Sequence, residues 1–238
     1  MRYRTAGGFR AALEERLRTS AAASEALLQR TRKLVAFERF LARIQSPGDD
    51  RWLLKGGFAL QLRLGNRART TKDVDLSANL GVFGRSDLSP EEVGDVLADA
   101  ASRDAGDFFK FEVGFSRELS LRVGPVRAFR YPVNGLVDGR TFERFHIDAG
   151  IGDPVALPPV LLPPSGLLEF AGLPAIAFRA IAPEQHLAEK VHAMTLPREG
   201  AENTRTRDLA DLMLLLDLGS CDPESVCRAV HAVFGTRK

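Results

Sequence analysis

The feature that most constrains how this 238-residue chain can fold is the segment between residues 55 and 76, in which a Gly-Gly pair precedes two closely spaced aspartates. Gly56 and Gly57 predict a tight turn that leads into a helix. Asp73 and Asp75 are separated by one valine in a β-rich, alternating run, so both side chains should lie on one face of a strand. Two neighbouring carboxylates repel each other unless a cation lies between them. The segment therefore predicts a strand that binds a divalent metal ion, and such ions commonly bind phosphate oxygens as well.

Another aspartate, Asp148, lies in the largely apolar run 145–151. Burying a lone carboxylate costs several kcal/mol, so a charged residue in a core strand must be paired or bound to metal. Converging carboxylates of this kind are what a two-metal phosphoryl-transfer site needs. A glycine turn adds backbone amides, which approach phosphate oxygens closely where no Cβ intervenes. Each of these elements is common, but together they predict a site for metal and phosphate.

Hydrophobic periodicity divides the chain into helices, then a mixed sheet, then further helices. Amphipathic spacing predicts helical structure between residues 11 and 44, and Ser89 followed by Pro90 predicts the start of another helix. The other predicted helices cover 58–64, 183–194, 207–216 and 223–233, and the predicted strands cover 51–54, 70–77, 108–115, 119–123, 126–133 and 144–151. The predicted fold class is therefore α+β, a mixed α/β chain whose later strands extend the sheet in antiparallel fashion.

The same pattern suggests a division into structural parts. We expect N-terminal helices that pack on the core over residues 1–48, the core sheet with both motifs over 49–155, and a mostly helical C-terminal lobe over 156–238. The proline-rich stretch 157–164 predicts a loop or a sheet edge. We also expect a nucleotide to bind in a cleft between the core and the C-terminal lobe.

Composition restricts the class of protein. With 45% hydrophobic and 27% charged residues, the chain is typical of a globular protein. The net charge of +2 does not by itself indicate a polyanionic partner. Residues 1–47, however, hold ten basic residues against four glutamates, so the net charge of this segment is about +6. This segment is either a phosphate-facing surface or a solvated helix face. The two cysteines lack the spacing of a metal site, which predicts free thiols. The sequence shows neither a secretory signal peptide nor an apolar run long enough to span a membrane, which predicts a cytoplasmic protein with no membrane partner.

The motifs, taken together, resemble the signature of the polymerase-β-type nucleotidyltransferase superfamily. The residues that carry this resemblance are Lys55-Gly-Gly57, Arg69-Thr-Thr-Lys-Asp-Val-Asp75 and Asp148. More narrowly, they look like the AbiEii toxins of bacterial abortive-infection and toxin–antitoxin systems, a branch that includes the MenT toxins. The runs 189–194 and 205–212 resemble later motifs of this branch, and the fifteen residues between Gly57 and Asp73 match its spacing.

The resemblance implies a polymerase-β-type nucleotidyltransferase core that transfers a nucleoside monophosphate from an NTP to the 3′ end of tRNA, releases pyrophosphate and so inhibits translation. It assigns Asp73 and Asp75 to Mg²⁺, with two ions expected, and Asp148 to the metal that activates the attacking 3′-hydroxyl. Gly56 and Gly57 would cradle the β and γ phosphates. The implied partners are the tRNA acceptor end, the NTP and a cognate antitoxin.

The remaining nucleotide-binding candidates are Lys55, Arg69, Thr71, Lys190, Asp208 and Asp211. The resemblance implies that Lys190 neutralises charge on the leaving pyrophosphate. Asp208 and Asp211 share a helix face, where they would orient Lys190, contact base and ribose, or form a structural clamp with nearby arginines. Thr71 would donate its hydroxyl to a phosphate oxygen. Lys55 and Arg69 would contact phosphate, unless Arg69 instead fixes its loop by pairing with a carboxylate.

Two other functions fit the sequence. One is a nucleotide- or RNA-binding protein without catalysis, which would have no need to keep Asp73, Asp75 and Asp148 together. The other is a nucleotidyltransferase that modifies a protein or a small molecule, because only the basic N-terminal segment argues for RNA. The salt dependence of acceptor binding separates nucleic acid from these acceptors, since phosphate contacts release counterions.

Overall fold

A computed structural model of the chain describes residues 1–22, 24–115, 117–118, 126–196, 206–219 and 221–237. Its helices are α1 (Ala6–Ser20), α2 (Glu25–Ile44), α3 (Gly56–Leu64), α4 (Leu80–Phe83), α5 (Pro90–Ala101), α6 (Pro183–Thr195), α7 (Thr206–Asp217) and α8 (Pro223–Thr236), with short 3₁₀ turns at Gly65–Arg67 and Glu169–Ala171. Its strands are β1 (Trp52–Lys55), β2 (Asp73–Ala78), β3 (Phe109–Val113), β4 (Arg117–Glu118), β5 (Arg127–Val137), β6 (Arg140–Ile151), β7 (Val160–Leu162) and β8 (Phe178–Ala180).

The described strands form one mixed sheet in the order β3-β5-β6-β2-β1-β8-β7, with β4 paired to β5. β5 and β6 form a long antiparallel hairpin whose turn, Asp138 and Gly139, has left-handed backbone angles at both positions. β2 runs parallel to β6 and antiparallel to β1. The predicted mixed α/β class, with an antiparallel extension of the sheet, is therefore confirmed.

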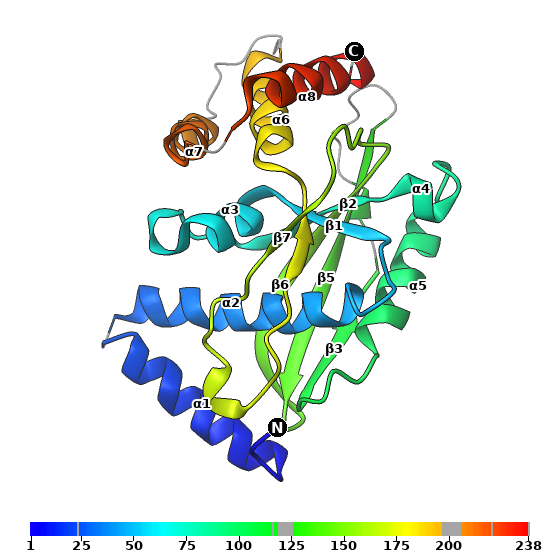
Figure 1. Cartoon of the computed structure of the whole chain (residues 1–238). Helices are drawn as coiled ribbons and strands as arrows, with labels where there is room; N and C mark the ends of the chain where they lie inside the picture. The colour runs from blue at the N-terminus through cyan, green and yellow to red at the C-terminus, as the bar shows by residue number, and fades with distance from the viewer. Residues whose placement is uncertain (23, 116, 119–125, 197–205, 220, 238) are drawn as a thin grey trace.

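The two faces of the sheet differ in chemistry because side chains alternate along each strand. Phe145, Ile147 and Ala149 of β6 are buried, and Phe145 packs edge-on against Phe37 and Phe40 of α2. Figure 1 shows α2 crossing this face of the sheet. The polar side chains that alternate with these residues lie on the opposite face, which carries the candidate site.

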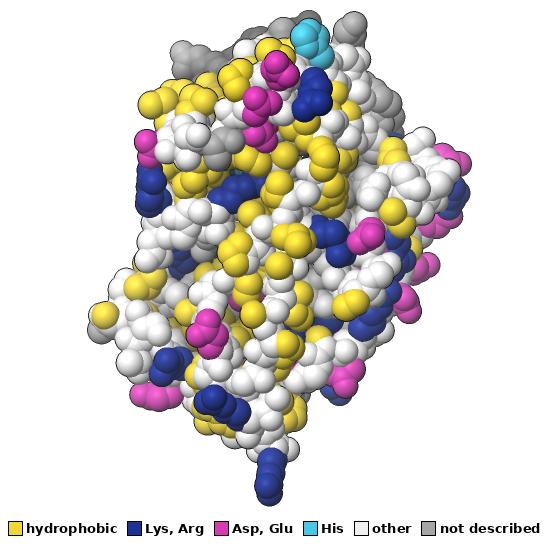
Figure 2. Space-filling model, in the orientation of Figure 1, with side chains coloured by type: hydrophobic (Ala, Val, Ile, Leu, Met, Phe, Trp, Pro, Cys, Tyr) yellow, Lys and Arg dark blue, Asp and Glu magenta, His cyan; other side chains and the backbone are white. Residues whose placement is uncertain are grey.

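The structure adds detail to the N-terminal helical region expected from the sequence. It consists of two helices, because Ala22 adopts a left-handed φ of 45° and Ser24 caps the N-terminus of α2. Two of its arginines are not part of a surface, since buried Arg39 and Arg43 both pair with Asp107. Figure 2 shows positive and negative side chains interspersed over this side of the molecule. The excess of arginine in the N-terminal segment is therefore partly structural.

The C-terminal helices lie at the end of the molecule away from the N-terminus (Figure 1). Leu187 of α6 and Leu215 of α7 pack with Leu60 of α3, while Ala188 of α6 packs with Val233 of α8. These two small clusters are distinct from the main core, which α1, α2 and α5 share with the sheet. The first of these clusters joins the helices that carry Lys190 and Asp211 to α3.

The remaining predicted elements agree with the structure where it describes them. The capping box at Ser89 and Glu92 starts α5 as expected. The stretch 157–164 contains the short strand β7 next to β8. The predicted strand 119–123 lies outside the described residues. Among the helices that the structure describes, none has the length and apolar character needed to cross a membrane.

Candidate active site

The carboxylates predicted to hold metal lie on adjacent strands of the sheet. Asp75 of β2 is opposite Asp148 of β6 in the parallel pairing, and Asp73 is opposite His146. Lys55 of β1 is opposite Asp75 on the other side. Because opposite residues in a register share a face, all of these side chains lie on the face turned away from Phe145. The structure thus brings together the aspartates that the sequence placed 73 residues apart.

The glycine turn packs directly against the second of these aspartates. Gly56 has a φ of +62°, and a Cβ at this position would overlap the Asp75 carboxylate. A Cβ on Gly57 would lie 2.8 Å from the Thr71 hydroxyl oxygen, which itself donates to the Asp73 carbonyl oxygen at 3.1 Å. The Gly57 backbone N–H also hydrogen-bonds to Asp75. Both glycines are therefore required for the close approach of the helix start to the carboxylates.

Asp75 experiences an excess of negative charge. Burial, followed by the charges of Asp148 and Asp73, raises the pKa of the Asp75 carboxyl from 3.8 to about 6, although Lys55 and the Gly57 backbone oppose this shift. A carboxylate whose charge is incompletely compensated is a favourable ligand for a cation. The oxygen donors and the residual charge both fit a divalent metal ion.

Sequence reasoning missed Arg130, which lies opposite Asp148 on β5. Its guanidinium donates to both Asp148 oxygens at 2.7 and 2.6 Å and to Asp73 at 3.4 Å. The hydrogen bonds from Arg130 to Asp148 are the main reason that its pKa is raised. Among the described residues, no group of three or more acidic, His or Cys side chains has the arrangement of a metal site. Arg130 therefore supplies the positive charge between two of the three aspartates.

The second cluster lies on α6 and α7. Lys190 donates to Asp211 at 2.7 Å and to Asp208 at 3.0 Å. Asp211 also accepts from Arg69, with its side chain 3.0 Å from the Arg69 guanidinium. Arg69 lies near the glycine turn, since a Cβ on Gly57 would be 3.8 Å from its terminal nitrogen. In the structure, Asp208 and Asp211 both pair with Lys190, and Arg69 pairs with Asp211.

Lys55 has a different environment from the other cationic candidates. Its ammonium group pairs with buried Asp153, which also accepts from Arg237 at 2.5 Å. Burial opposes the charge of Lys55, but Asp153 and Glu189 outweigh this effect and raise the Lys55 pKa. Lys55 thus joins the glycine turn to the C-terminal residues instead of projecting freely. Neither Asp153 nor Arg237 belongs to a motif, so the sequence contained no local signal for this pair.

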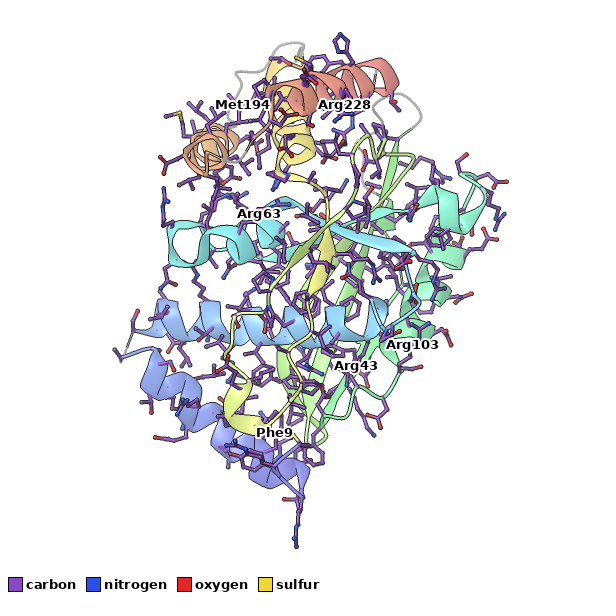
Figure 3. The ribbon with its side chains drawn as sticks, viewed as in Figure 1. Phe9, Arg43, Arg63, Arg103, Met194 and Arg228 are labelled. Atoms are coloured by element: carbon purple, nitrogen blue, oxygen red, sulfur yellow. The ribbon has the colours of Figure 1, made fainter. Side chains whose placement is uncertain are left out.

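Arg63 fixes α3 relative to α6. It donates to the Ile181 carbonyl oxygen and lies 3.1 Å from Nδ1 of His186, which is at the start of α6. Figure 3 shows Arg63 between these two helices. Burial lowers the pKa of Arg63 to about 10 and that of His186 well below its usual value. This contact holds the helix that carries Lys190 beside the helix that begins at the glycine turn.

Comparisons with known proteins give one matching family model and several similar solved structures. A family model described as the nucleotidyltransferase AbiEii toxin of a type IV toxin–antitoxin system matches residues 39–238. None of the curated proteins is similar enough to be matched. The match spans the sheet and the C-terminal helices, and it confirms both the resemblance found in the motifs and the nucleotidyltransferase core.

Several solved structures are similar at low identity. A protein from H. pylori assigned as a nucleotidyltransferase is 16% identical with a TM-score of 0.44, over 82% of this chain and 69% of that one. The antibiotic-resistance factor ANT(2″)-Ia is 14% identical with a TM-score of 0.43, over 86% of this chain and 92% of that one. An antigenic nucleotidyltransferase-like protein from Paracoccidioides brasiliensis is 17% identical with a TM-score of 0.45, over 87% of this chain and 88% of that one.

Proposed function

Since the chain belongs to the AbiEii nucleotidyltransferase toxin family, we propose that it transfers a nucleoside monophosphate from an NTP to the 3′ end of tRNA in the cytoplasm and thereby inhibits translation. The observation that carries this proposal is the placement of Asp73, Asp75 and Asp148 on one sheet face beside the glycine turn. The toxin–antitoxin family implies an antitoxin as a further partner.

Asp73, Asp75 and Asp148 are the residues that would hold Mg²⁺, and we expect two ions. When bound, Mg²⁺ would offset the negative charge that develops on the transferred phosphoryl group. Both Asp148 oxygens accept hydrogen bonds from Arg130, which therefore competes with a metal ion for this carboxylate. We expect metal binding to displace Arg130 from Asp148.

The glycine turn and its neighbours are placed to bind the triphosphate. Gly56 and Gly57 begin α3, so the positive end of this helix dipole faces the carboxylates. The Thr71 hydroxyl and the Arg69 guanidinium border the turn, and Arg69 is the more exposed member of its ion pair, at 36% against 1% for Asp211. Arg69 is thus the cation we assign to the phosphates, while Lys190 positions it through Asp211.

The reaction follows from this arrangement. The 3′-hydroxyl oxygen of the acceptor forms a bond to the α phosphorus, and the bond from that phosphorus to the β-phosphate oxygen breaks. The hydroxyl proton passes to the Asp148 carboxylate and then to solvent, and pyrophosphate leaves. Arg69, held by Asp211 and Lys190, stabilises the charge on this leaving group.

The test is incubation of the purified protein with total tRNA and each radiolabelled NTP in turn, followed by sequencing of the labelled 3′ ends. We expect one or more NTPs to label tRNA, and Asp73→Asn to reduce labelling by about 10³-fold, because a charged group that acts in the transition state is lost. The matched control is Asp95→Asn, which alters an exposed aspartate on α5.

The same assay distinguishes the alternatives. Unchanged labelling by Asp73→Asn would contradict the assignment of the metal ligands. Release of pyrophosphate without labelled RNA would indicate a protein or small-molecule acceptor. Binding of NTP with neither product would indicate a protein that binds nucleotides without catalysis.

A further inference from the structure

The sheet face that carries the carboxylates continues beyond them into a cavity. The volume of this cavity is about 470 Å³, and it lies over β3, β5 and β6. Its lining includes Glu112, Gly114, Pro132, Asn134, Arg144 and His146.

The cavity and the carboxylates form one continuous surface. His146 lines the cavity and is also opposite Asp73 in the β2–β6 register, with 3.5 Å between its Nδ1 and the Asp73 carboxylate. Pro132 of β5 is opposite His146 and is two residues from Arg130. A ligand on this surface would therefore have one end at Asp73 and Asp148.

The chemistry of phosphoryl transfer assigns the two sides of the carboxylates. In an in-line displacement, the attacking oxygen and the leaving group lie on opposite sides of the phosphorus. The glycine turn packs against Asp75 from the β1 and α3 side, and this is the side proposed for the triphosphate. The attacking 3′-hydroxyl must then approach from the β6 and β5 side, where the cavity lies.

The exposed groups around the cavity suit a single-stranded nucleic acid. Phe115 directly follows the lining residue Gly114, and its side chain is 100% exposed. Arg144 is exposed, and no ion pair to it is found within the described residues. The carboxylate of Glu112 is engaged by the Asn134 amide at 2.9 Å. Aromatic rings that stack on bases, combined with cations that contact phosphates, are how proteins bind single strands.

We propose that this surface binds the last nucleotides of a single-stranded RNA 3′ end, with Phe115 stacking on a base and Arg144 contacting a phosphate. This proposal rests on the proposed function, because it locates the acceptor relative to the transferred phosphoryl group. A continuous face of three strands leading to the carboxylates fits an extended strand better than a compact small molecule.

The test compares RNA binding by Phe115→Ala and Arg144→Ala with binding by the wild-type chain. The probe is a short fluorescein-labelled single-stranded RNA, and its Kd is measured by anisotropy at several salt concentrations. We expect Phe115→Ala to raise the Kd by about tenfold and Arg144→Ala to reduce the slope of log affinity against log salt by about 0.7. The Kd for a fluorescent NTP should be unchanged in both.

The controls alter similar exposed side chains elsewhere. Leu161→Ala removes an exposed apolar side chain from β7, at the opposite end of the sheet from β3, and Arg18→Ala removes a positive charge from α1. Both controls should bind RNA as the wild-type chain does. RNA affinities of Phe115→Ala and Arg144→Ala equal to those of the controls would overturn the proposal.

The same variants also distinguish failure of the RNA-binding proposal from failure of the proposed transfer function. If the wild-type chain labels no RNA but Phe115→Ala and Arg144→Ala lose RNA affinity, the RNA surface is supported and nucleotidyl transfer to RNA is not. If the wild-type chain labels RNA and both variants keep their affinity and their KM for RNA, the transfer function stands and this location of the acceptor is wrong.

Discussion

The two regions that flank the carboxylates are built in different ways. On the helical side, Lys190 and Asp211 have side chains only 9% and 1% exposed, and each charge is met by an opposite one. On the sheet side, the side chains of Arg130 and His146 are 35% and 48% exposed, and Asp75 retains uncompensated charge. The helical side is therefore a preformed support, whereas the sheet side must rearrange when a cation binds.

This difference has an energetic consequence. Removing one partner of a buried ion pair leaves the other charge in a poorly solvated environment, which is strongly destabilising. Removing one partner from a half-exposed pair costs less, because water takes its place. Substitutions on the helical side should thus affect folding first, and those on the sheet side should affect ligand binding first.

The largest effect is expected from Asp211→Ala, which removes the shared partner of Lys190 and Arg69. We expect the free energy of unfolding to fall by about 3 kcal/mol, because the buried Lys190 charge then keeps only Asp208 as a partner and Arg69 loses its own. Urea denaturation measures this change. The matched control is Asp217→Ala on the same helix, whose partner Arg67 is exposed, so its loss should cost less than about 1 kcal/mol. Equal losses in the two variants would show that the buried cluster has no special structural role.

The next effect is expected from Arg130→Met, which removes the cation that holds Asp148 and approaches Asp73. Mg²⁺ should bind about tenfold more tightly, because a charge-assisted hydrogen bond worth 1.4 kcal/mol or more no longer competes. Calorimetric titration of the nucleotide-free protein with Mg²⁺ gives the affinity, with Arg85→Met on the surface as the control. Weaker binding by Arg130→Met would mean that Arg130 orients the aspartates for the metal instead of competing with it.

A third effect concerns pH on the helical side. Burial, followed by the charges of Lys190, Arg63, Lys55 and Arg69, holds the pKa of His186 well below its usual value of 6.5. As the pH falls below 6.5, the unfolded chain takes up a proton at His186 that the folded chain does not, so folding stability decreases. The contribution of this one residue is at most about 1.4 kcal/mol per pH unit.

This pH effect can be isolated with His186→Gln. Between pH 7 and 5, the wild-type chain should lose stability relative to the variant, as measured by urea denaturation at each pH. The control is His231→Gln on α8, where the imidazole is exposed and contacts the Cys227 carbonyl oxygen. An identical pH dependence of the wild-type chain and His186→Gln would contradict the buried, neutral state of His186.

Local patterns predicted much of the fold. Alternation around Asp73 and Asp75 located β2, and the Ser89 cap located α5. The position of the break after α1 was not predicted, because it depends on a left-handed φ at Ala22, a residue type that carries no signal for this conformation. Hydrophobic spacing therefore predicts whether a segment is a helix or a strand better than it predicts the positions at which the segment is interrupted.

The candidate site was predictable only where its residues belong to motifs. Asp148 could be singled out because a carboxylate in an apolar run needs a partner. Its actual partner in the structure, Arg130, depends on the register of the β5–β6 hairpin. Likewise, Lys55 and Asp153 pair across 98 positions of the sequence. Such contacts are determined by tertiary packing, so no local sequence pattern predicts them.

The central claim is that Asp73, Asp75 and Asp148 hold a divalent metal once Arg130 has released Asp148. Titration with Mn²⁺ in the presence of NTP, followed by electron paramagnetic resonance, measures bound metal directly. We predict that the wild-type chain and Asp95→Asn bind Mn²⁺ with the same affinity and that Asp75→Asn loses most of this binding. Unchanged Mn²⁺ binding by Asp75→Asn would contradict the claim.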